Sequence, residues 1–469
     1  MQLGFVIDQS RCIGCHACSV ACKQENDVPL GGFRTWVKYV EAGTFPEVDR
    51  HFAVLRCNQC TRPPCAAICP TGALQKRADG VVDLDRDACV GCRACLQACP
   101  YEALHFDDSR GVASKCHFCA HRVEKSLAPA CVSVCPTQAL LPVDLHDPAD
   151  RQAAAVREGR TTVRRPEFET GPNVHYVAAS PLALVPEAAH RDSAWLWAER
   201  TPGRPEVVGV GPDGARVVLE PVHRVPWGWH VTTFLLVKGA ESGLAFLAPL
   251  TELEPTVVSG IAAVGTAVVA ALMVADLGRP ERFLYLLTRG NPKSWLVRGA
   301  WLLLVYGTVQ GVAFVGALLG ATALAEALGW AGAAMAPAVA GYSAQLFGQC
   351  EGRPFWAAAR AWPRLLSQAL TAGGALAVAL GATALVPAAL AGLAVYAAVA
   401  WSYRASADPA APYLRSARPW GLAPLAGLAL GAAALLGALV VPALALLVIP
   451  ALYVEDTAWL RAGQLPPNS

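Results

Sequence analysis

Sixteen of the 17 cysteines of this chain stand in four groups of four, and all four groups lie before residue 136. They are Cys12, Cys15, Cys18 and Cys22; Cys57, Cys60, Cys65 and Cys69; Cys89, Cys92, Cys95 and Cys99; and Cys116, Cys119, Cys131 and Cys135. The first and third groups share the spacing C-x2-C-x2-C-x3-C. Three closely spaced thiolates can hold one face of an iron–sulfur cube, while a fourth cysteine beyond the turn reaches a neighbouring cluster. The spacing therefore predicts iron–sulfur clusters arranged in pairs.

An internal repeat accompanies the cysteines. Cys-Pro-Thr-Gly-Ala-Leu (69–74), Cys-Pro-Tyr-Glu-Ala-Leu (99–104) and Cys-Pro-Thr-Gln-Ala-Leu (135–140) are copies of one unit, and Asp8 to Cys15 matches Asp85 to Cys92. Such repeats indicate duplicated modules. Zinc is the alternative for paired CxxC motifs, but a zinc site requires no Cys-Pro unit. We therefore favour iron–sulfur ligation for all four groups.

The compartment in which the chain resides decides whether its cysteines form disulfides or bind metal. Met1 to Ser10 lacks the basic start, apolar run and cleavage site of a secretory signal, and the Arg164-Arg165 pair is internal. We expect no export, hence reduced thiols and metal ligation in place of disulfides. The formal net charge is only +2, from 38 basic and 36 acidic residues, so no nucleic-acid partner is expected.

Residues 1 to about 180 resemble the four-cluster electron-transfer subunit of the dimethyl sulfoxide and polysulfide reductase families, including the Pro-Asn-Val-His-Tyr stretch at 172–176. The resemblance implies an α+β, duplicated bacterial-ferredoxin-like domain over 1–180. It also implies four [4Fe–4S] clusters, because Cys92 is present where some relatives lack a cysteine of the third group and carry a three-iron cluster. The implied ligand sets are Cys12, Cys15, Cys18 and Cys135; Cys116, Cys119, Cys131 and Cys22; Cys57, Cys60, Cys65 and Cys99; and Cys89, Cys92, Cys95 and Cys69.

The second half of the chain has the composition of a membrane domain. After a linker over 181–227, with a turn signal and a possible hairpin at Pro-Asp-Gly (212–214), residues 228–469 contain apolar runs of membrane length. A buried soluble core does not account for so many long apolar runs with so few charges. We predict an all-α transmembrane bundle of about eight helices. The predicted spans are 229–250, 255–275, 294–319, 324–346, 364–385, 387–403, 420–436 and 437–454.

The charges between these spans are unevenly distributed. Glu252, Glu254 and Glu326 lie in the loops on one side, and the basic residues lie on the side of the N-terminus. The positive-inside rule then predicts a multi-pass inner-membrane protein with a cytoplasmic iron–sulfur domain, although arginines that dock this domain would bias the rule. The basic residues are Arg279, Arg282, Arg289, Lys293, Arg353, Arg360, Arg404, Arg415 and Arg418.

Haem is not expected in this membrane domain. His230 is the last histidine of the chain, so a bis-histidine site cannot form within the bundle. Electrons leaving the clusters should therefore pass to a lipid-soluble carrier, a quinone such as menaquinone or ubiquinone.

Residues 228–400 resemble the quinone-binding membrane subunit of polysulfide reductase and of formate-dependent nitrite reductase systems. Three stretches carry the resemblance: Trp229-His230-Val231-Thr232, Asp276 to Phe283, and Gly352-Arg353-Pro354-Phe355-Trp356. It implies that Asp276 and Tyr342 match the acidic residue and the tyrosine near the quinone.

Polar residues within such a bundle are candidates for function. His230 is a candidate to donate a hydrogen bond to a quinone carbonyl and to exchange a proton with it. Lys238 and Glu241 are candidates for part of a proton path. The structural alternatives are an interfacial His230, an Asp276 that pairs with Arg279, an aromatic-belt Tyr342 and a buried Lys238–Glu241 ion pair. Cys350, the seventeenth cysteine, is expected to be a free thiol.

The leading hypothesis is an electron-transfer and membrane-anchor subunit that links a quinone pool to a separate catalytic partner and is not itself catalytic for the main substrate. The resemblance implies a molybdenum or tungsten bis-pterin subunit as that partner. The alternative is an anchor or relay subunit of a hydrogenase or an ion-translocating redox complex, without quinone chemistry of its own.

Overall fold

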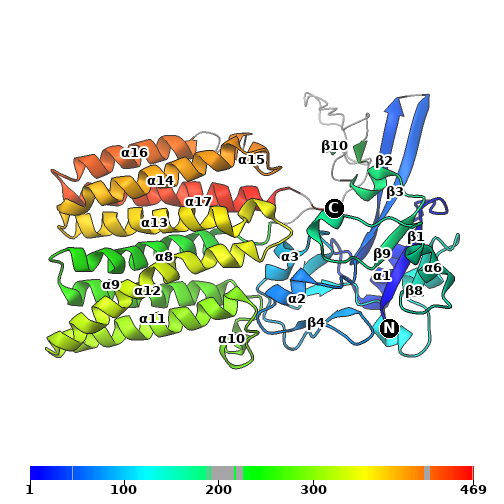
Figure 1. Ribbon diagram of the computed structural model, residues 1–469, viewed down its shortest axis with the longest axis horizontal. Coiled ribbons are helices and arrows are strands. Elements are labelled where there is room, and N and C mark those ends of the chain that lie inside the picture. Colours follow the sequence, from blue (N-terminus) through cyan, green and yellow to red (C-terminus); the bar gives the residue numbers. More distant parts are fainter. Residues whose placement is uncertain are drawn as a thin grey trace. The chain divides into compact units, whose positions relative to one another are not determined.

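The computed structural model describes residues 1–44, 46–186, 190–191, 216–217, 225–416, 423–466 and 468. The chain divides into two compact units, Met1–Arg224 with Pro467–Ser469, and Val225–Pro466. The first is an α+β unit of short elements, and the second is helical (Figure 1). The turn signal at 212–214 lies outside the described residues.

Small sheets and short helices make up the α+β unit. β1, an apolar strand, is central in a three-stranded sheet, antiparallel to β8 and parallel to β9. Its residues Phe5 and Ile7 are fully buried, so this sheet lies in the core. The other sheets have the orders β10-β11-β2-β3, β4-β5 and β6-β7. The strands are β1 (Leu3–Asp8), β2 (Thr35–Thr44), β3 (Glu47–Arg56), β4 (Leu74–Lys76), β5 (Val82–Leu84), β6 (Leu104–Asp107), β7 (Val112–Lys115), β8 (Leu140–Asp144), β9 (Val174–Val177), β10 (His190–Arg191) and β11 (Arg216–Val217).

The sequence repeat is also a structural repeat. In each copy a short helix ends one or two residues before the Cys-Pro step, and the leucine of the copy begins a strand, at Leu74, Leu104 and Leu140. Proline cannot continue a helix, which accounts for the common turn. The duplicated ferredoxin-like architecture is therefore confirmed. The helices of this unit are α1 (Ala17–Asn26), α2 (Pro64–Ile68), α3 (Ala94–Ala98), α4 (Ala120–Val123), α5 (Ala130–Ser133), α6 (Arg151–Arg157) and α7 (Pro181–Leu184), with a 3-10 turn at Pro166–Phe168.

Long antiparallel helices form the second unit. α8 packs against α9, α12 and α13, and α11 packs against α9 and α12 (Figure 1). α13 also packs against α14, and α16 packs against α17. The helices are α8 (Trp229–Leu247), α9 (Pro255–Ala275), α10 (Tyr285–Thr288), α11 (Trp295–Leu318), α12 (Thr322–Gly348), α13 (Ala358–Ala379), α14 (Val386–Ala405), α15 (Ala411–Ser416), α16 (Ala423–Gly437) and α17 (Val448–Gln464). Short 3-10 segments lie at Ala248–Leu250, Pro280–Arg282, Pro354–Trp356, Thr383–Leu385 and Pro442–Leu447.

Six helices among the described residues are long and apolar enough to cross a membrane, which makes this a multi-pass membrane protein. The predicted number of about eight includes two further helices of the bundle. α13 carries Arg360 and Arg364 and so is less apolar, and α16 has only 15 residues. The last span was predicted too early, at 437–454, because the apolar pattern stops before two carboxylates that α17 in fact contains.

Glycine permits a close approach between α8 and α13. A Cβ atom on Gly243 would overlap the carbonyl oxygen of Ala369, and one on Gly373 would overlap the backbone of Gly243. Small residues of this kind let membrane helices pack backbone against backbone. The contact fixes α8, which carries three of the predicted site residues, against α13.

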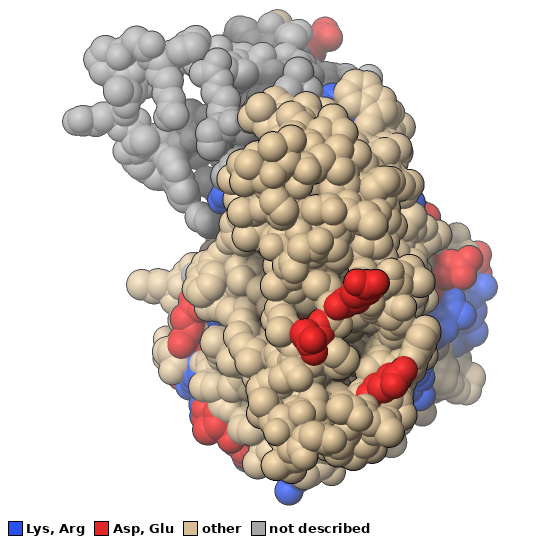
Figure 2. Space-filling model, turned by 90° about the vertical axis from the view of Figure 1, so that its left-hand side faces the viewer, with Lys and Arg blue, Asp and Glu red and all other residues tan. Residues whose placement is uncertain are grey.

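Some residues assigned to loops from the sequence lie in helices or are buried. Arg353 lies in a loop, as predicted, but is buried and donates to the carbonyl oxygen of Pro466, and Arg404 is buried at the end of α14. Glu326 stands in α12, and Arg418 lies outside the described residues. Figure 2 shows the end of the bundle where α8 connects to α9, with acidic side chains on a surface that is otherwise mostly uncharged. Thus the charge asymmetry persists among the described residues, with fewer exposed loop arginines than predicted.

Candidate functional site

Two of the implied cysteine sets each line one cavity of the α+β unit. Cys12, Cys15, Cys18 and Cys135 surround the first cavity. Cys69, Cys89, Cys92 and Cys95 surround the second. Each cavity thus combines three cysteines of one group with the last cysteine of a distant group.

The fold brings the other two sets together as well. Cys22 interacts electrostatically with Cys116, Cys119 and Cys131. Asn26 connects this set, because its side-chain amide lies 3.7 Å from the sulfur of Cys22 and 3.8 Å from that of Cys119. Cys57, Cys60, Cys65 and Cys99 form the remaining set, in which Cys65 interacts with the three others. All sixteen predicted ligands therefore fall into four local sets.

Burial makes these thiols unfavourable as free anions. Burial raises the pKa of Cys18 to about 11 and that of Cys60 to about 12. Iron replaces the thiol proton when it binds, so ligation relieves this cost. Arg56 and Lys115, both buried, provide positive charge beside the cysteines.

The residues present fit iron–sulfur clusters. Backbone N–H groups point at two sulfurs, from Leu74 to Cys69 at 3.5 Å and from Ala139 to Cys135 at 3.2 Å. Such N–H···S bonds tune cluster potentials. Among the described residues no group of three or more His, Cys, Asp or Glu is arranged to hold a single metal ion. Two of the cysteine sets instead line cavities.

His230 and Asp276 meet at one end of the bundle. His230 is the second residue of α8 and Asp276 caps the end of α9, and 3.7 Å separates Nδ1 from Oδ1. The His230 ring stacks on Trp229, with 3.8 Å between the ring centroids. Both side chains remain partly exposed, at 29% and 18%. A histidine paired with a carboxylate is a suitable donor to a carbonyl group.

Lys238 and Tyr342 form a second pair, eight residues further along α8, which is about 12 Å from His230. The Lys238 ammonium lies 4.3 Å from the centre of the Tyr342 ring and donates to Ser343 Oγ at 2.6 Å and to the Ala340 carbonyl at 3.0 Å. Lys238 is thus held by α12, which differs from the simple Lys238–Glu241 ion pair weighed from the sequence.

Glu241 lies on the face of α8 that packs against α9. It is 2% exposed and accepts a hydrogen bond from Thr266 at 3.3 Å, and Tyr306 of α11 adjoins it. Gly265 makes room for it, since a Cβ atom there would lie 2.8 Å from that of Glu241. Lys238 therefore contacts α12, whereas Glu241 contacts α9 and α11.

Comparison with known proteins agrees with this geometry. Residues 5–25 match the 4Fe-4S binding domain, residues 48–144 the 4Fe-4S dicluster domain, and residues 217–390 the polysulphide reductase NrfD family. A tetrathionate reductase subunit of Salmonella typhimurium is 39% identical over 202 residues, which cover 42% of this chain and 80% of that protein.

This protein belongs to the family of ferredoxin-type iron–sulfur subunits of oxidoreductase complexes. In this iron–sulfur subunit the ferredoxin part is fused to an NrfD membrane domain. A sulfite dehydrogenase subunit of Allochromatium vinosum is 37% identical over 219 residues, 41% of this chain and 91% of that protein. One polypeptide of the anaerobic dimethyl sulfoxide reductase of Escherichia coli is 41% identical over 148 residues, 30% of this chain and 72% of that protein.

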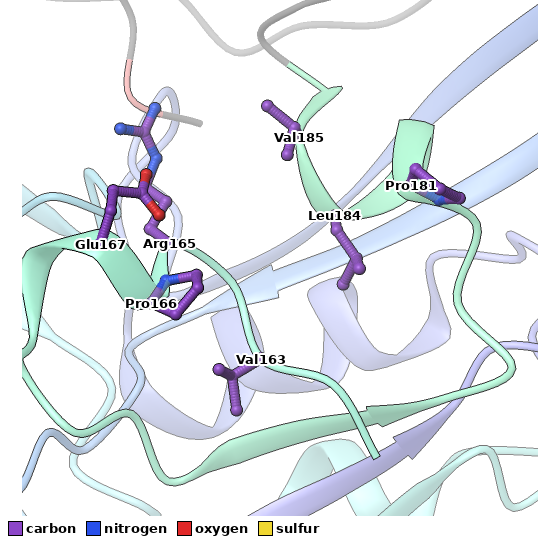
Figure 3. A pocket seen from close by; sticks show the side chains of 7 residues that line it. All are labelled: Val163, Arg165, Pro166, Glu167, Pro181, Leu184 and Val185. Carbon is purple, nitrogen blue, oxygen red and sulfur yellow. The ribbon is translucent and has the colours of Figure 1, made fainter. Parts of the chain in front are cut away.

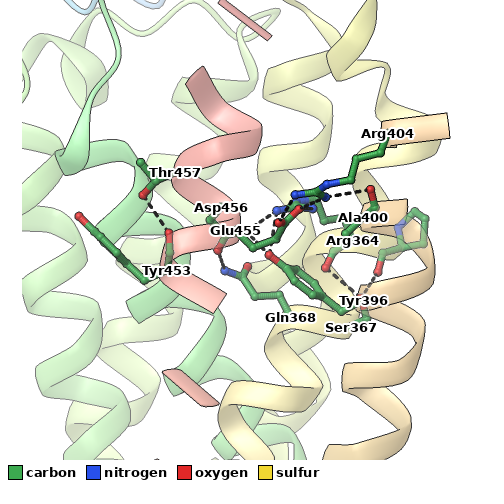
Figure 4. Close-up of polar contacts among 11 residues, drawn as sticks. Arg364, Ser367, Gln368, Tyr396, Ala400, Arg404, Tyr453, Glu455, Asp456 and Thr457 are labelled. Carbon is green, nitrogen blue, oxygen red and sulfur yellow. Dashed lines mark hydrogen bonds and ion pairs between the residues drawn. The ribbon is translucent and has the colours of Figure 1, made fainter. Parts of the chain in front are cut away.

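The membrane domain of the iron–sulfur subunit also contains a buried ionic network that the sequence reasoning missed (Figure 4). It comprises Arg364 of α13, Arg404 of α14, and Glu455 and Asp456 of α17, here called the ionic quartet. Each side chain is at most 2% exposed. The sequence does contain one indication of this network, because Glu455 and Asp456 are adjacent carboxylates within an otherwise apolar run.

A separate pocket lies on the α+β unit of the protein, lined by Val163, Arg165, Pro166, Glu167, Pro181, Leu184 and Val185 (Figure 3). It contains none of the predicted site residues, and its lining is mainly apolar apart from Arg165 and Glu167. We assign it no role.

Proposed function

We propose that this protein carries electrons between a quinone in the membrane and a separate catalytic subunit, through four [4Fe–4S] clusters. The observation that supports this most strongly is the convergence of the sixteen cysteines into four sets. The proposed ligands are those sets as given above. Each cluster exchanges one electron at a time, and the protein sets its potential through charge, N–H···S bonds and burial.

The first cysteine set is the proposed point of exchange with the partner. Cys15 is exposed, whereas the cysteines of the second and third groups are buried or half-buried. Exposed apolar residues stand near this set, among them Ile13, Val20 and Val134. Exposed apolar surface marks protein interfaces. The relatives are named as subunits of reductases and a dehydrogenase, and the family resemblance favours a molybdenum or tungsten bis-pterin partner.

We place the quinone beside His230 and Asp276, at the end of α8 and α9. Reduction of a quinone to a quinol consumes two electrons and two protons. His230 would donate to a carbonyl oxygen, and Asp276 would hold the imidazole and stabilise its protonated form. Tyr342 would be a further residue near the quinone, as the resemblance implies, and Lys238 and Glu241 would supply the protons from the interior of the bundle.

The proposed topology is a multi-pass inner-membrane protein with the iron–sulfur unit in the cytoplasm. Support comes from the remaining exposed cations near α10 and from the acidic opposite end (Figure 2). Protease treatment of sealed inverted vesicles should digest the N-terminal half. Protection of that half would place it on the other side.

The first test of the function is the metal content of the complex, purified from membranes in mild detergent without air. We expect about 16 iron atoms per chain, together with about one molybdenum or tungsten atom. The same preparation should oxidise or reduce an added quinone. Full iron content with neither heavy metal would instead favour the hydrogenase or relay alternative, and a lack of quinone reaction would reduce the membrane domain to an anchor.

A further inference from the structure

The two carboxylates of the ionic quartet have different kinds of partner. Glu455 is held by guanidinium groups: Arg404 binds it through two nitrogens at 2.8 and 2.7 Å, and Arg364 lies 3.7 Å away. A guanidinium can only donate hydrogen bonds. A proton on Glu455 would therefore face donors and would find no acceptor among these partners.

Asp456 has two neutral partners besides an arginine. The Tyr396 hydroxyl donates to its Oδ1 at 2.6 Å, Arg364 donates to the same oxygen at 2.8 Å, and the Gln368 amide donates to Oδ2 (Figure 4). A hydroxyl can turn to accept a hydrogen bond, and an amide can present its carbonyl oxygen. Asp456 can thus be bonded in its protonated form as well as in its ionised form.

Gln368 also reaches the neighbouring site on α8. Its Oε1 lies 3.4 Å from the position that a Cβ atom of Gly239 would occupy. Gly239 follows Lys238 directly in the chain. The amide that binds Asp456 thus lies against the helix segment that carries Lys238.

The arginines of the quartet provide further buried donors. The Nε atoms of Arg364 and Arg404 have no hydrogen-bond partner among the described protein atoms. A hydrogen-bond donor without an acceptor inside a membrane costs free energy, and internal water is the usual acceptor at a polar buried site. Water at these atoms would give protons access to Asp456.

The charges around Asp456 balance in its ionised form. α13 contributes Arg364 and α14 contributes Arg404 and Tyr396, while Glu455 precedes Asp456 on α17. α16 has no ionisable residue, α15 carries Tyr413 and the exposed Arg415, and Lys238 of α8 is held by α12. Two cations and two anions sum to zero, so an added proton gives the quartet a charge of +1. A quinone that has taken up two electrons and only one proton carries a charge of −1, which offsets it.

We propose that Asp456 is a proton-binding site that is protonated when the quinone is reduced and deprotonated when it is oxidised. A proton from water forms an O–H bond on Oδ2 as Gln368 turns its carbonyl oxygen toward it, and Asp456 changes from anion to neutral acid. No electron enters the quartet. This inference rests on the proposed quinone reaction and adds a second protonation site, on helices remote in sequence from His230.

Redox-induced infrared difference spectroscopy on the full complex in liposomes tests the inference. On reduction with a soluble quinone analogue, we expect a carbonyl band of a newly protonated carboxylic acid that shifts in D2O. The band should be lost in Asp456→Asn and retained in Thr457→Ala, a control on the same helix whose hydroxyl bonds only its own helix, at Tyr453. Iron content checks that both variants assemble.

If Asp456→Asn fails to assemble, Asp456→Glu keeps the charge, and the band should then shift in frequency. Quinone signals without a carboxylic acid band, or with a band unchanged in the Asp456 variant, would overturn the inference and leave a purely structural ionic network. Spectra without quinone signals would overturn the proposed quinone reaction instead, and the coupling with it.

Discussion

The buried guanidinium of Arg56 lies against the sulfur of Cys131, with 3.6 Å between Nη1 and Sγ. The same group stacks over the Phe5 ring at 4.2 Å and bonds Thr35 at 3.1 Å. A fixed cation beside a proposed cluster ligand stabilises the reduced, more negative cluster. Arg56 is therefore expected to raise the potential of the cluster assigned to Cys22, Cys116, Cys119 and Cys131.

Replacing Arg56 with Met, which fills a similar space without charge, should lower that potential by on the order of 100 mV. A redox titration followed by electron paramagnetic resonance would measure it. Arg56→Lys, which keeps the charge, is the control and should shift it much less. Equal potentials in the wild-type protein and Arg56→Met would contradict this electrostatic role.

His105 gives the α+β unit a dependence on pH. Burial, with the nearby charge of Arg34, lowers the pKa of His105 to about 4, from about 6.5 in an unfolded chain. The folded state thus favours the neutral ring. The stability that this provides is complete above about pH 6.5 and is lost as the pH falls towards 4, by about 2 kcal/mol at pH 5.

This prediction can be checked by comparing urea-induced loss of the iron–sulfur absorbance at pH 7 and pH 5. His105→Asn retains a donor for the Phe33 carbonyl, which His105 contacts at 3.1 Å, but does not titrate. Its midpoint should fall less on acidification than that of the wild-type protein. His146→Asn, at an exposed position, should behave like the wild type.

The contact of Gly243 with Ala369 and Gly373 predicts a steric defect. Gly243→Val should separate α8 from α13 and cost at least 1–3 kcal/mol, the usual range for overpacking. Detergent-solubilised yield and thermal aggregation temperature would report it. Gly311→Val on α11 is the matched control, because a Cβ atom there meets nothing within 4 Å. Equal losses in both variants would show that the close approach is not essential.

Cysteine variants can distinguish the proposed cluster ligands from Cys350, the one cysteine outside the four groups. Cys135→Ser should remove the cluster proposed at the first cavity, so iron content should fall from about 16 to about 12 atoms per chain. Cys350→Ser, in the membrane domain, should leave it unchanged. An unaltered iron content in Cys135→Ser would remove Cys135 from the proposed ligands.

The sequence predicted the cysteine half well because its signals are local. Cys-Pro turns and repeated spacings depend on residues close together in the chain, and Leu74, Leu104 and Leu140 begin equivalent strands. The pairing of Cys12 with Cys135 is not local, and it came from the family resemblance. The resemblance likewise singled out Asp276, which lies beside His230 in the structure.

The membrane charges were harder to interpret. The sequence pattern assigns Arg404 to a loop and ends the last span before Glu455 and Asp456, because a charge in an apolar run normally marks a helix end. In the bundle these charges neutralise one another across segments 51 and 92 residues apart. A hydropathy pattern contains no information on such pairs. For the same reason it did not show that Lys238 bonds Ser343 on α12.

Glu241 allows the proposed proton path to be tested separately from the clusters. Glu241→Gln keeps the shape and the Thr266 contact but cannot carry a proton. If it supplies protons, quinone turnover should fall by about 100-fold, the lower range for a general acid or base, with iron content and cluster potentials unchanged. Glu281→Gln, at an exposed carboxylate 3.4 Å from Arg279, is the matched control and should retain full turnover. Since the two variants make the same change of Glu to Gln, a rate loss confined to Glu241→Gln can be assigned to the buried position. Full turnover in Glu241→Gln would remove it from the path and leave Lys238 as the remaining candidate.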